Sequence, residues 1–528
     1  MNKLFAMLIQ HESLHLDTNG CMQHLAIHTK QEYEVKSFMS FPIYVKAPAI
    51  IRMLQYISSK DIYQFIKIIR EYFKVHQLQT VTANDLWAII DKDNSSKLRD
   101  HTNPTYNIPN LKKLMHTWIK EMHYPVLKVI RNYHNNMVMM LQENHNILDR
   151  NQWWIPVTYT TQTELEFTDI LPKLWLQPGV QNLIIEETVQ KNEWIIANLQ
   201  QAGYYRVNYD PTNWRLIIDY LNHEDYWKID VLNRAQIIDN AYHLMTIQQL
   251  DYDIFLNLTN YLSQEMDYVA WYPMLKILEY LSPFLPLEES TPLKDHMLKI
   301  LNKILANIKY EELEDEDYFT ICLRQELAKW ACILDDPYYK QLANTRLTQH
   351  LEDPVQNKLL SGWKEWTYCN GLNIASKITW LKFWNAYTKL SNNRMLHIIS
   401  CSGGFANPNL QLNTKALKHV TKSFRLHECI NLFYFVITMN EKDLDSTLAN
   451  LGNHIVYCKN TSDDIIKVIT VIINHLYFEY QLLKVLNFVN CNVNAKRHIA
   501  HIKHTILTRE YYIKIHKMTF LKIIKNWI

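Results

Sequence analysis

The sequence predicts a mainly α-helical protein, and three observations lead to this fold class. The chain has 528 residues, which is too long for one hydrophobic core and indicates about three domains. It contains only 8 glycines and 16 prolines, so it has few positions for tight turns. Apolar residues recur mostly at helical spacing, and strand-like alternation is concentrated between residues 123 and 222. We therefore expect helical segments at 1–122 and 223–528 on either side of a β-rich segment.

The first segment, residues 1–122, is expected to form helices because 49–57, 62–73 and 84–90 carry apolar residues three and four positions apart. It also contains the string HESLH at 11–15. In a helix this spacing places His11 and His15 one turn apart on one face, with Glu12 available as a general base, which is the pattern of zinc peptidases. Residues 17–20 favour the end of a helix soon after this string.

The middle segment, residues 123–222, carries short alternating runs that predict a small β-sandwich. Two apolar runs at 194–196 and 204–207 are expected to pair as a hairpin, with Gly203 supplying the positive φ that its connection needs. Asp210 and Pro211 then end the strand and begin an amphipathic helix.

The last segment, residues 223–528, shows one helical pattern after another, without strands or long linkers. The first clear amphipathic helix is expected at 231–241. Such a succession predicts an α-solenoid of helix pairs.

Composition limits the classes of partner. The 55 Lys and Arg residues nearly balance the 53 Asp and Glu residues, and no basic stripe predicts binding to nucleic acid. No apolar stretch reaches the ~20 residues needed to cross a bilayer. Residues 1–10 lack the small-residue cleavage site of a signal peptide, so the sequence assigns no clear signal peptide or anchor.

The cysteines and the glycosylation triplets bear on the compartment in which the chain resides. The 8 cysteines include no CxxC pair and no spacing typical of a zinc ribbon. Asn94, Asn257 and Asn460 each begin an Asn-x-Ser/Thr triplet, the acceptor pattern for N-glycosylation. These triplets have meaning only if the chain is secreted.

Several strings occur in the order found in one known family. They are YVKAPAIIRML at 44–54, WIIANLQQAGYYRVNYD at 194–210, VLNRAQIIDNA at 231–241 and WTYCNG at 366–371. Through them the chain resembles the aminopeptidase N-type zinc metallopeptidases, the gluzincin aminopeptidases, over essentially its whole length. The resemblance implies that 1–122 is the truncated, helical C-terminal part of a thermolysin-like catalytic domain, followed by a β-sandwich at 123–222 and an α-solenoid at 223–528.

The same resemblance implies a function and three site residues. The family consists of zinc-dependent hydrolases that remove N-terminal residues from peptides, outside the cell or anchored at its surface. Tyr44 stands where the family has a tyrosine whose hydroxyl donates to the tetrahedral oxyanion. Cys369 and Cys401 fall where the family has a disulfide, whereas Cys332 lacks the partner that a second family disulfide would need.

The chain also departs from the family around the metal. Ala47 replaces a family glycine, and the Gly-x-Met-Glu-Asn loop that binds the substrate's free amine is missing from the sequence. Glu34 stands at the family's distance for a third zinc ligand, so His11, His15 and Glu34, with Glu12 as the base, form one alternative. The strings LDTN at 16–19 and YEVK at 33–36 do not match the family's flanking strings. We therefore expect that HESLH is not a zinc site and that this chain does not bind zinc.

Two hypotheses remain open from the sequence. In the first, the chain is related to a peptide-cleaving zinc aminopeptidase but is a catalytically incomplete fragment or a divergent copy. In the second, it is a non-catalytic, peptide-binding scaffold or a pseudoenzyme.

Overall fold

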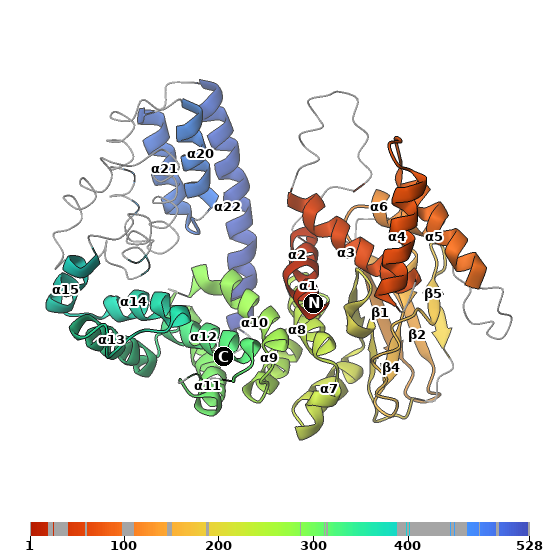
Figure 1. Ribbon diagram of the computed structural model, residues 1–528, viewed down its shortest axis with the longest axis horizontal. Helices are drawn as coiled ribbons and strands as arrows, with labels where there is room; N and C mark the ends of the chain where they lie inside the picture. The colour runs from red at the N-terminus through yellow and green to blue at the C-terminus, as the bar shows by residue number, and fades with distance from the viewer. Residues whose placement is uncertain are drawn as a thin grey trace. The chain divides into compact units, whose positions relative to one another are not determined.

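The structure is a computed structural model of the chain. It describes residues 2–18, 25, 41–58, 61–97, 110–144, 150–185, 189–285, 287–310, 312, 315–387, 398, 401, 444, 448, 462–474, 476–492 and 496–525. The chain divides into two compact units, Met1–Leu278 and Glu279–Ile528. Most of the described residues lie in helices (Figure 1), so the prediction of a mainly α protein is confirmed.

The first unit begins with a group of helices gathered near one end of the strands (Figure 1). They are α1 (Asn2–Phe5), the π-helix η1 (Ala6–His11), α2 (Glu12–Thr18), α3 (Phe41–Ser58), α4 (Ile62–Val75), α5 (Ala83–Lys97) and α6 (Leu111–Lys120). Amphipathic spacing explains their packing, since α6 buries Leu114 and Trp118 on one face and exposes Lys113 on the other.

The strands of the first unit form three small sheets. The largest has the order β6-β2-β1-β8, in which β1 (Pro125–Arg131) pairs antiparallel with β2 (Val138–Asn144) and parallel with β8 (Arg206–Tyr209). The strand β6 (Leu183–Ile185) pairs antiparallel with β2. The two other sheets pair β3 (Ile155–Val157) with β5 (Leu174–Leu176), and β4 (Tyr159–Thr161) with β7 (Ile195–Ala197).

The predicted hairpin between 194–196 and 204–207 is wrong. The strand β7 pairs with β4, and β8 pairs with β1, so the two apolar runs belong to different sheets. The chain turns between them through η3 (Leu199–Gln201), and positive φ angles occur at Asn198, Gln200 and Gln201. Gly203 does not have a positive φ.

Gly203 is needed for a different reason, which is space. A Cβ atom at this position would lie 2.0 Å from a ring carbon of Tyr205. The side chain of Asn198 holds the corner, because its amide donates to the carbonyls of Gly203 and Tyr205 and its carbonyl oxygen accepts from the Gly203 amide. The connection is therefore a side-chain-stabilised corner, not a tight hairpin turn.

The remaining helices of the first unit are α7 (Pro211–Leu221), η4 (Glu224–Lys228), α8 (Val231–Thr246), α9 (Tyr252–Thr259), η5 (Asn260–Ser263) and α10 (Tyr268–Leu281), whose last turn belongs to the second unit. The helix expected after Asp210 is confirmed as α7, and the Asp210 carboxylate caps it by accepting from the amides of Thr212 and Asn213. Helix α8 is buried along almost its entire length, on its polar as well as its apolar side.

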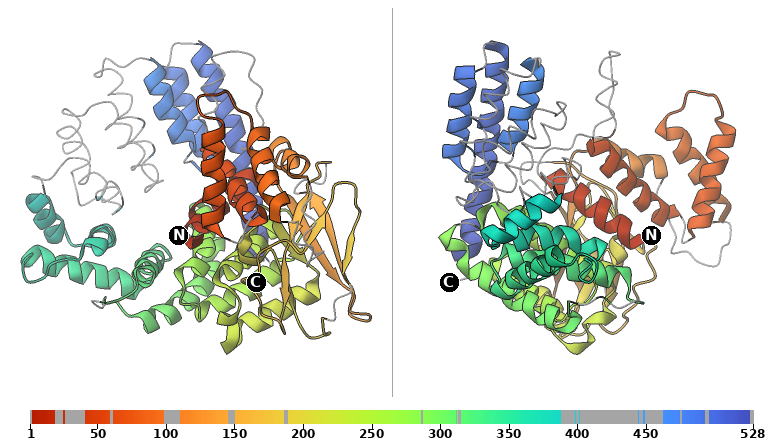
Figure 2. Two further views of the ribbon diagram at one scale, coloured as in Figure 1. Left: turned by 45° about the vertical axis from the view of Figure 1, so that its right-hand side comes forward. Right: turned by 60° about the vertical axis from the view of Figure 1, so that its left-hand side comes forward.

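The second unit is helical throughout its described residues. Its helices are η6 (Ser282–Phe284), η7 (Glu288–Ser290), α11 (Thr291–Ile308), α12 (Tyr318–Ile333), α13 (Pro337–Glu352), η8 (Ser361–Trp363), α14 (Lys364–Asn373), α15 (Lys377–Tyr387), α20 (Ser462–Asn474), α21 (Glu479–Asn492) and α22 (Lys496–Lys525). Consecutive helices from α11 to α14 pack against each other, and α20, α21 and α22 lie side by side (Figure 2).

The cysteines of the second unit differ in state. Cys369 on α14 forms a disulfide with Cys401, and their Cα atoms are 5.1 Å apart. Cys322, Cys332 and Cys491 are free thiols, and burial raises the pKa of Cys332 to about 12. Within the described parts of both units, no helix is long and apolar enough to cross a membrane.

Candidate functional site

A group of buried polar side chains lies where η1 and α2 meet the corner at residues 198–205. Gln10 donates its side-chain amide to the carbonyls of Gln201 and Gly203, at 2.9 and 3.0 Å. Ser13 shares a hydrogen bond of 2.8 Å with the hydroxyl of Tyr204. The HESLH helix is thus fixed to the corner by hydrogen bonds between residues that are about 190 positions apart in sequence.

Helix α3, which carries Tyr44, is attached to the same group. Its Lys46 is 1% exposed and donates from Nζ to Asp17 Oδ2 at 2.8 Å and to the carbonyl of His123 at 3.1 Å. Asp17, which is fully buried, also accepts from the hydroxyl of Tyr204 at 3.1 Å. The protein interior tolerates this buried pair because the two charges neutralise each other and the Lys46 ammonium donates two hydrogen bonds.

A second buried ion pair lies between β8 and α8. Arg206 is 1% exposed, donates from Nη1 to Asp239 and from Nε to the hydroxyl of Tyr124, and lies over the Tyr124 ring. Although burial alone would raise the pKa of Asp239, the neighbouring Arg206 holds that pKa well below its usual range. The Asp239 carboxylate is therefore ionised.

His11 faces this ion pair. Its ring is buried, and its Nδ1 lies 3.8 Å from Asp239 Oδ1, while Nε2 of His243 lies 3.4 Å from the same oxygen. Burial lowers the pKa of His11, the charge of Asp239 opposes this effect, and Arg206 adds to it. The net result is a neutral imidazole in the protein interior at pH 7.

The structure does not place the sequence-predicted site residues in one environment. Tyr44 is 57% exposed on α3, His11 is buried, and His15 is half-buried with its ring centroid 5.3 Å from that of His243. Glu34, the proposed third ligand, lies outside the described residues.

The described residues do not fit a zinc ion at HESLH. The nitrogens of His11 point into the interior beside the Arg206 guanidinium, whose positive charge opposes a divalent cation, and the nearest carboxylate, Asp239, is already paired with that arginine. No three His, Cys, Asp or Glu side chains of the described residues are arranged to hold a metal ion.

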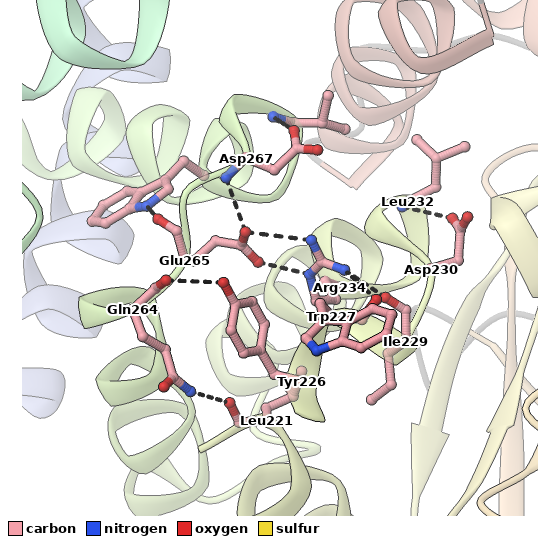
Figure 3. Close-up of polar contacts among 12 residues, drawn as sticks. Leu221, Tyr226, Trp227, Ile229, Asp230, Leu232, Arg234, Gln264, Glu265 and Asp267 are labelled. Carbon is pink, nitrogen blue, oxygen red and sulfur yellow. Dashed lines mark hydrogen bonds and ion pairs between the residues drawn. The ribbon is translucent and has the colours of Figure 1, made fainter. Parts of the chain in front are cut away.

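Another buried ion pair connects α8 to the loop before α10 (Figure 3). Arg234 donates from Nε and Nη2 to the two carboxylate oxygens of Glu265, at 2.6 and 3.3 Å, and from Nη1 to the carbonyl of Ile229. Glu265 Oε1 accepts in addition from the amide of Asp267. Figure 3 also shows Tyr226 donating to the carbonyl of Gln264 beside this pair.

Sequence reasoning missed the partners in both arginine–carboxylate pairs. Arg206 lies inside an alternating strand pattern, and Arg234 and Asp239 lie within the buried helix α8. A charged residue inside a buried pattern signals a buried partner, but spacing alone does not say which residue that partner is.

Comparison with protein families finds two matches. Residues 194–490, more than half of the chain, match the family described as ERAP1-like C-terminal domain. Residues 1–118 match the family described as Peptidase family M1 domain.

Individual relatives agree with these matches. The chain is 26% identical to Aminopeptidase N of Plutella xylostella over 375 residues, which cover 68% of this chain and 38% of that protein. It is 25% identical to Membrane alanyl aminopeptidase of Manduca sexta, over 70% of this chain and 37% of that protein. It is 24% identical to Thyrotropin-releasing hormone-degrading ectoenzyme of Homo sapiens, over 75% of this chain and 38% of that protein. The chain thus spans well under half the length of these relatives.

Proposed function

The chain belongs to the M1 metallopeptidase family of aminopeptidase N-type proteins, and from that membership we propose that it forms the C-terminal framework of a peptide-processing protein, without a complete zinc site of its own. The processing reaction in such a protein is the removal of N-terminal residues from peptides. Three of its relatives are named as aminopeptidase, membrane aminopeptidase or ectoenzyme.

One observation supports the incomplete site most directly, and it is the environment of His11. Its imidazole is buried against Asp239, beside Arg206, in an interior that favours the neutral ring and disfavours an added cation. Histidines that bind catalytic zinc face an open cavity, where a water or substrate completes the coordination. In this proposal His11 therefore acts as a packing residue.

The framework has three proposed parts. Residues 1–122 are the helical end of a catalytic domain, residues 123–222 a β-sandwich and residues 223–528 an α-solenoid of helix pairs. The three small sheets between residues 125 and 209, and the succession of helices from α7 onward, support this division.

Tyr44 has a proposed role that does not require HESLH. Its side chain is exposed on α3, while the next-but-one residue, Lys46, is anchored to Asp17. A rigid helix with one exposed phenol can present a hydrogen-bond donor to an oxyanion on a bound peptide. In this proposal, Lys46 acts as a positioning residue and Tyr44 as the donor.

A second candidate function is a non-catalytic, peptide-binding scaffold or pseudoenzyme. The burial of His11 favours this candidate as well, because neither reading uses HESLH for chemistry. The two differ in whether the hydroxyl of Tyr44 contacts a bound peptide.

The test measures metal and turnover together. Purified chain, with zinc added, is expected to retain less than stoichiometric zinc and to release no product from the chromogenic amides of Ala and Leu. His11→Ala and the Glu12→Gln control should leave the zinc content unchanged, since neither side chain binds the ion. Chelator-sensitive turnover that is lost in Glu12→Gln would contradict the proposal. Binding of labelled peptides without turnover, unaffected by Tyr44→Phe, would select the scaffold.

A further inference from the structure

Helix α9 carries a glycosylation triplet that the proposed function does not use. Asn257, Leu258 and Thr259 lie in its last turn, and Asn257 is exposed while its neighbours Leu256 and Leu258 are buried. An exposed asparagine is compatible with the attachment of a large hydrophilic group, because nothing in the core has to move. Of the other two triplets, Asn460 lies outside the described residues.

The surface around Asn257 is hollowed and is lined by polar and apolar side chains. A depression of about 570 Å³ lies between α7 and α9, and Asn257 is one of its lining residues. Its lining includes the charged and amide side chains of Arg215, Asp219, Asn222 and Asp253. These groups can exchange hydrogen bonds with sugar hydroxyls.

Thr259 constrains when such a modification could occur. In the folded protein this residue is 1% exposed, and its hydroxyl donates to the carbonyl of Leu256 at 2.7 Å. The transferase that recognises Asn-x-Ser/Thr must contact this hydroxyl, so it can recognise the triplet only before α9 packs.

The second unit provides independent information on the compartment. The disulfide between Cys369 and Cys401 is a feature of proteins that fold in oxidising surroundings, such as the lumen of the secretory pathway. That lumen is also where N-linked glycans are attached.

We propose that Asn257 carries an N-linked glycan, attached during entry into the secretory pathway and before α9 packs into the first unit. The donor is an oligosaccharide joined through a pyrophosphate to a membrane lipid. The side-chain amide nitrogen of Asn257 forms a bond to the anomeric carbon and loses one proton. The bond between that carbon and the pyrophosphate oxygen breaks, and the lipid pyrophosphate leaves with its electron pair. The modification does not depend on peptidase activity.

The experiment measures glycosylation at Asn257 separately from glycosylation at the other triplets. The full chain is secreted from insect cells, digested, and treated with a glycan-releasing amidase in heavy-oxygen water, which converts a glycosylated Asn to labelled Asp. Peptide mass spectrometry is expected to find the label at position 257 in the wild type and in Thr259→Ser, and to find none in Thr259→Val or Asn257→Gln. The surface variant Asn257→Gln removes the acceptor without touching the core, so the result does not depend on how well Thr259→Val folds.

The disulfide is the internal control that a molecule has folded in the oxidising secretory pathway. Unlabelled Asn257 in secreted wild-type molecules that contain the Cys369–Cys401 disulfide would overturn the proposal. A second arm tests the order of events with unglycosylated protein, a purified transferase and the lipid donor. Modification is expected for the unfolded chain only, and equal modification of the folded chain would refute the timing.

Discussion

The two buried arginine–carboxylate pairs of the first unit differ in what surrounds them. Arg234 and Glu265 are joined by two hydrogen bonds, and backbone carbonyls and amides complete the pair (Figure 3). Arg206 and Asp239 are equally buried, but Nη2 of Arg206 has no hydrogen-bond partner among the described residues. This second pair also faces titratable side chains, of which His11 is one.

The comparison separates two consequences of burying a charge. For a pair surrounded by backbone hydrogen bonds, the contribution to the free energy of unfolding does not change with pH near neutrality. The reason is that neither partner has a neighbour that changes charge in this range. A pair that faces a neutral histidine, here His11, makes stability depend on pH, because that histidine must gain charge on acidification.

The largest expected effect is on the backbone-bonded pair. Glu265→Gln should lower the free energy of unfolding of the chain by about 3–5 kcal/mol, because it leaves the buried guanidinium of Arg234 without a counter-charge. Denaturant titration followed by circular dichroism measures this loss. The matched control is the double variant Arg234→Met, Glu265→Leu, which removes both charges and should recover most of the stability. A single-variant loss well below this range would mean that the pair does not stabilise the contact between α8 and the loop before α10.

The next effect concerns the strand that carries Arg206. Gly203→Ala should lower the free energy of unfolding by about 1–3 kcal/mol, because the new methyl group would overlap the buried Tyr205 ring, which must shift. The near-UV circular dichroism of the packed tyrosines should change with it. Gly179→Ala is the control, since a Cβ there meets no atom within 4 Å and any cost comes from its φ of 82°. An unchanged near-UV spectrum in Gly203→Ala would show that the corner adapts without moving the ring.

Acidification should affect the histidine-facing pair through His11. Because burial lowers its folded-state pKa below the unfolded value of 6.5, the unfolded state binds a proton first as the pH falls. Stability is therefore full above pH 6.5 and declines below it, by at most about 1.4 kcal/mol per pH unit for one histidine. Asp239 adds nothing in this window, since Arg206 keeps its folded pKa below the unfolded value of 3.8.

Urea titrations between pH 7.5 and pH 5 measure this slope. His11→Gln should flatten the slope, whatever it does to stability at pH 7, and the exposed His116→Gln on α6 should retain the wild-type slope. Equal slopes in the wild type and in His11→Gln would contradict the proposal that the surroundings of the Arg206–Asp239 pair make stability depend on pH.

The smallest effect is expected at an exposed pair. Lys228 and Asp225 lie 3.0 Å apart with their side chains 37% and 38% exposed. Asp225→Ala should change the free energy of unfolding by less than about 1 kcal/mol, because solvent screens the pair. A loss as large as that of Glu265→Gln would show that burial is not what distinguishes these pairs.

The sequence by itself determined features that depend on neighbours in the chain. The mainly helical class follows from apolar spacing and the scarcity of glycine, and helix α7 begins where Asp210 and Pro211 predict. Capping acts over three residues, so its signal is complete in the local sequence. The strings that identify the family are local in the same sense, and the family matches agree with them.

Tertiary structure alone decided which residues of the candidate site face solvent. Tyr44 and Lys46 lie two positions apart on one helix, yet Tyr44 is exposed and Lys46 is buried. The difference arises because Asp17 and the carbonyl of His123 approach only one side of α3. In the same way, HESLH has the spacing of a zinc motif, but the surroundings of its first histidine are set by Asp239 on α8, a residue far along the chain.

The pairing of strands was also beyond the local pattern. The runs at 194–196 and 204–207 look like two arms of a hairpin, but each finds its hydrogen-bond partners in a distant strand, β4 for the first and β1 for the second. Alternation predicts that a segment is a strand, since the side-chain period is a property of the segment. It does not predict the partner, because every strand offers the same backbone donors and acceptors, and the competition among them is resolved only when the whole core packs.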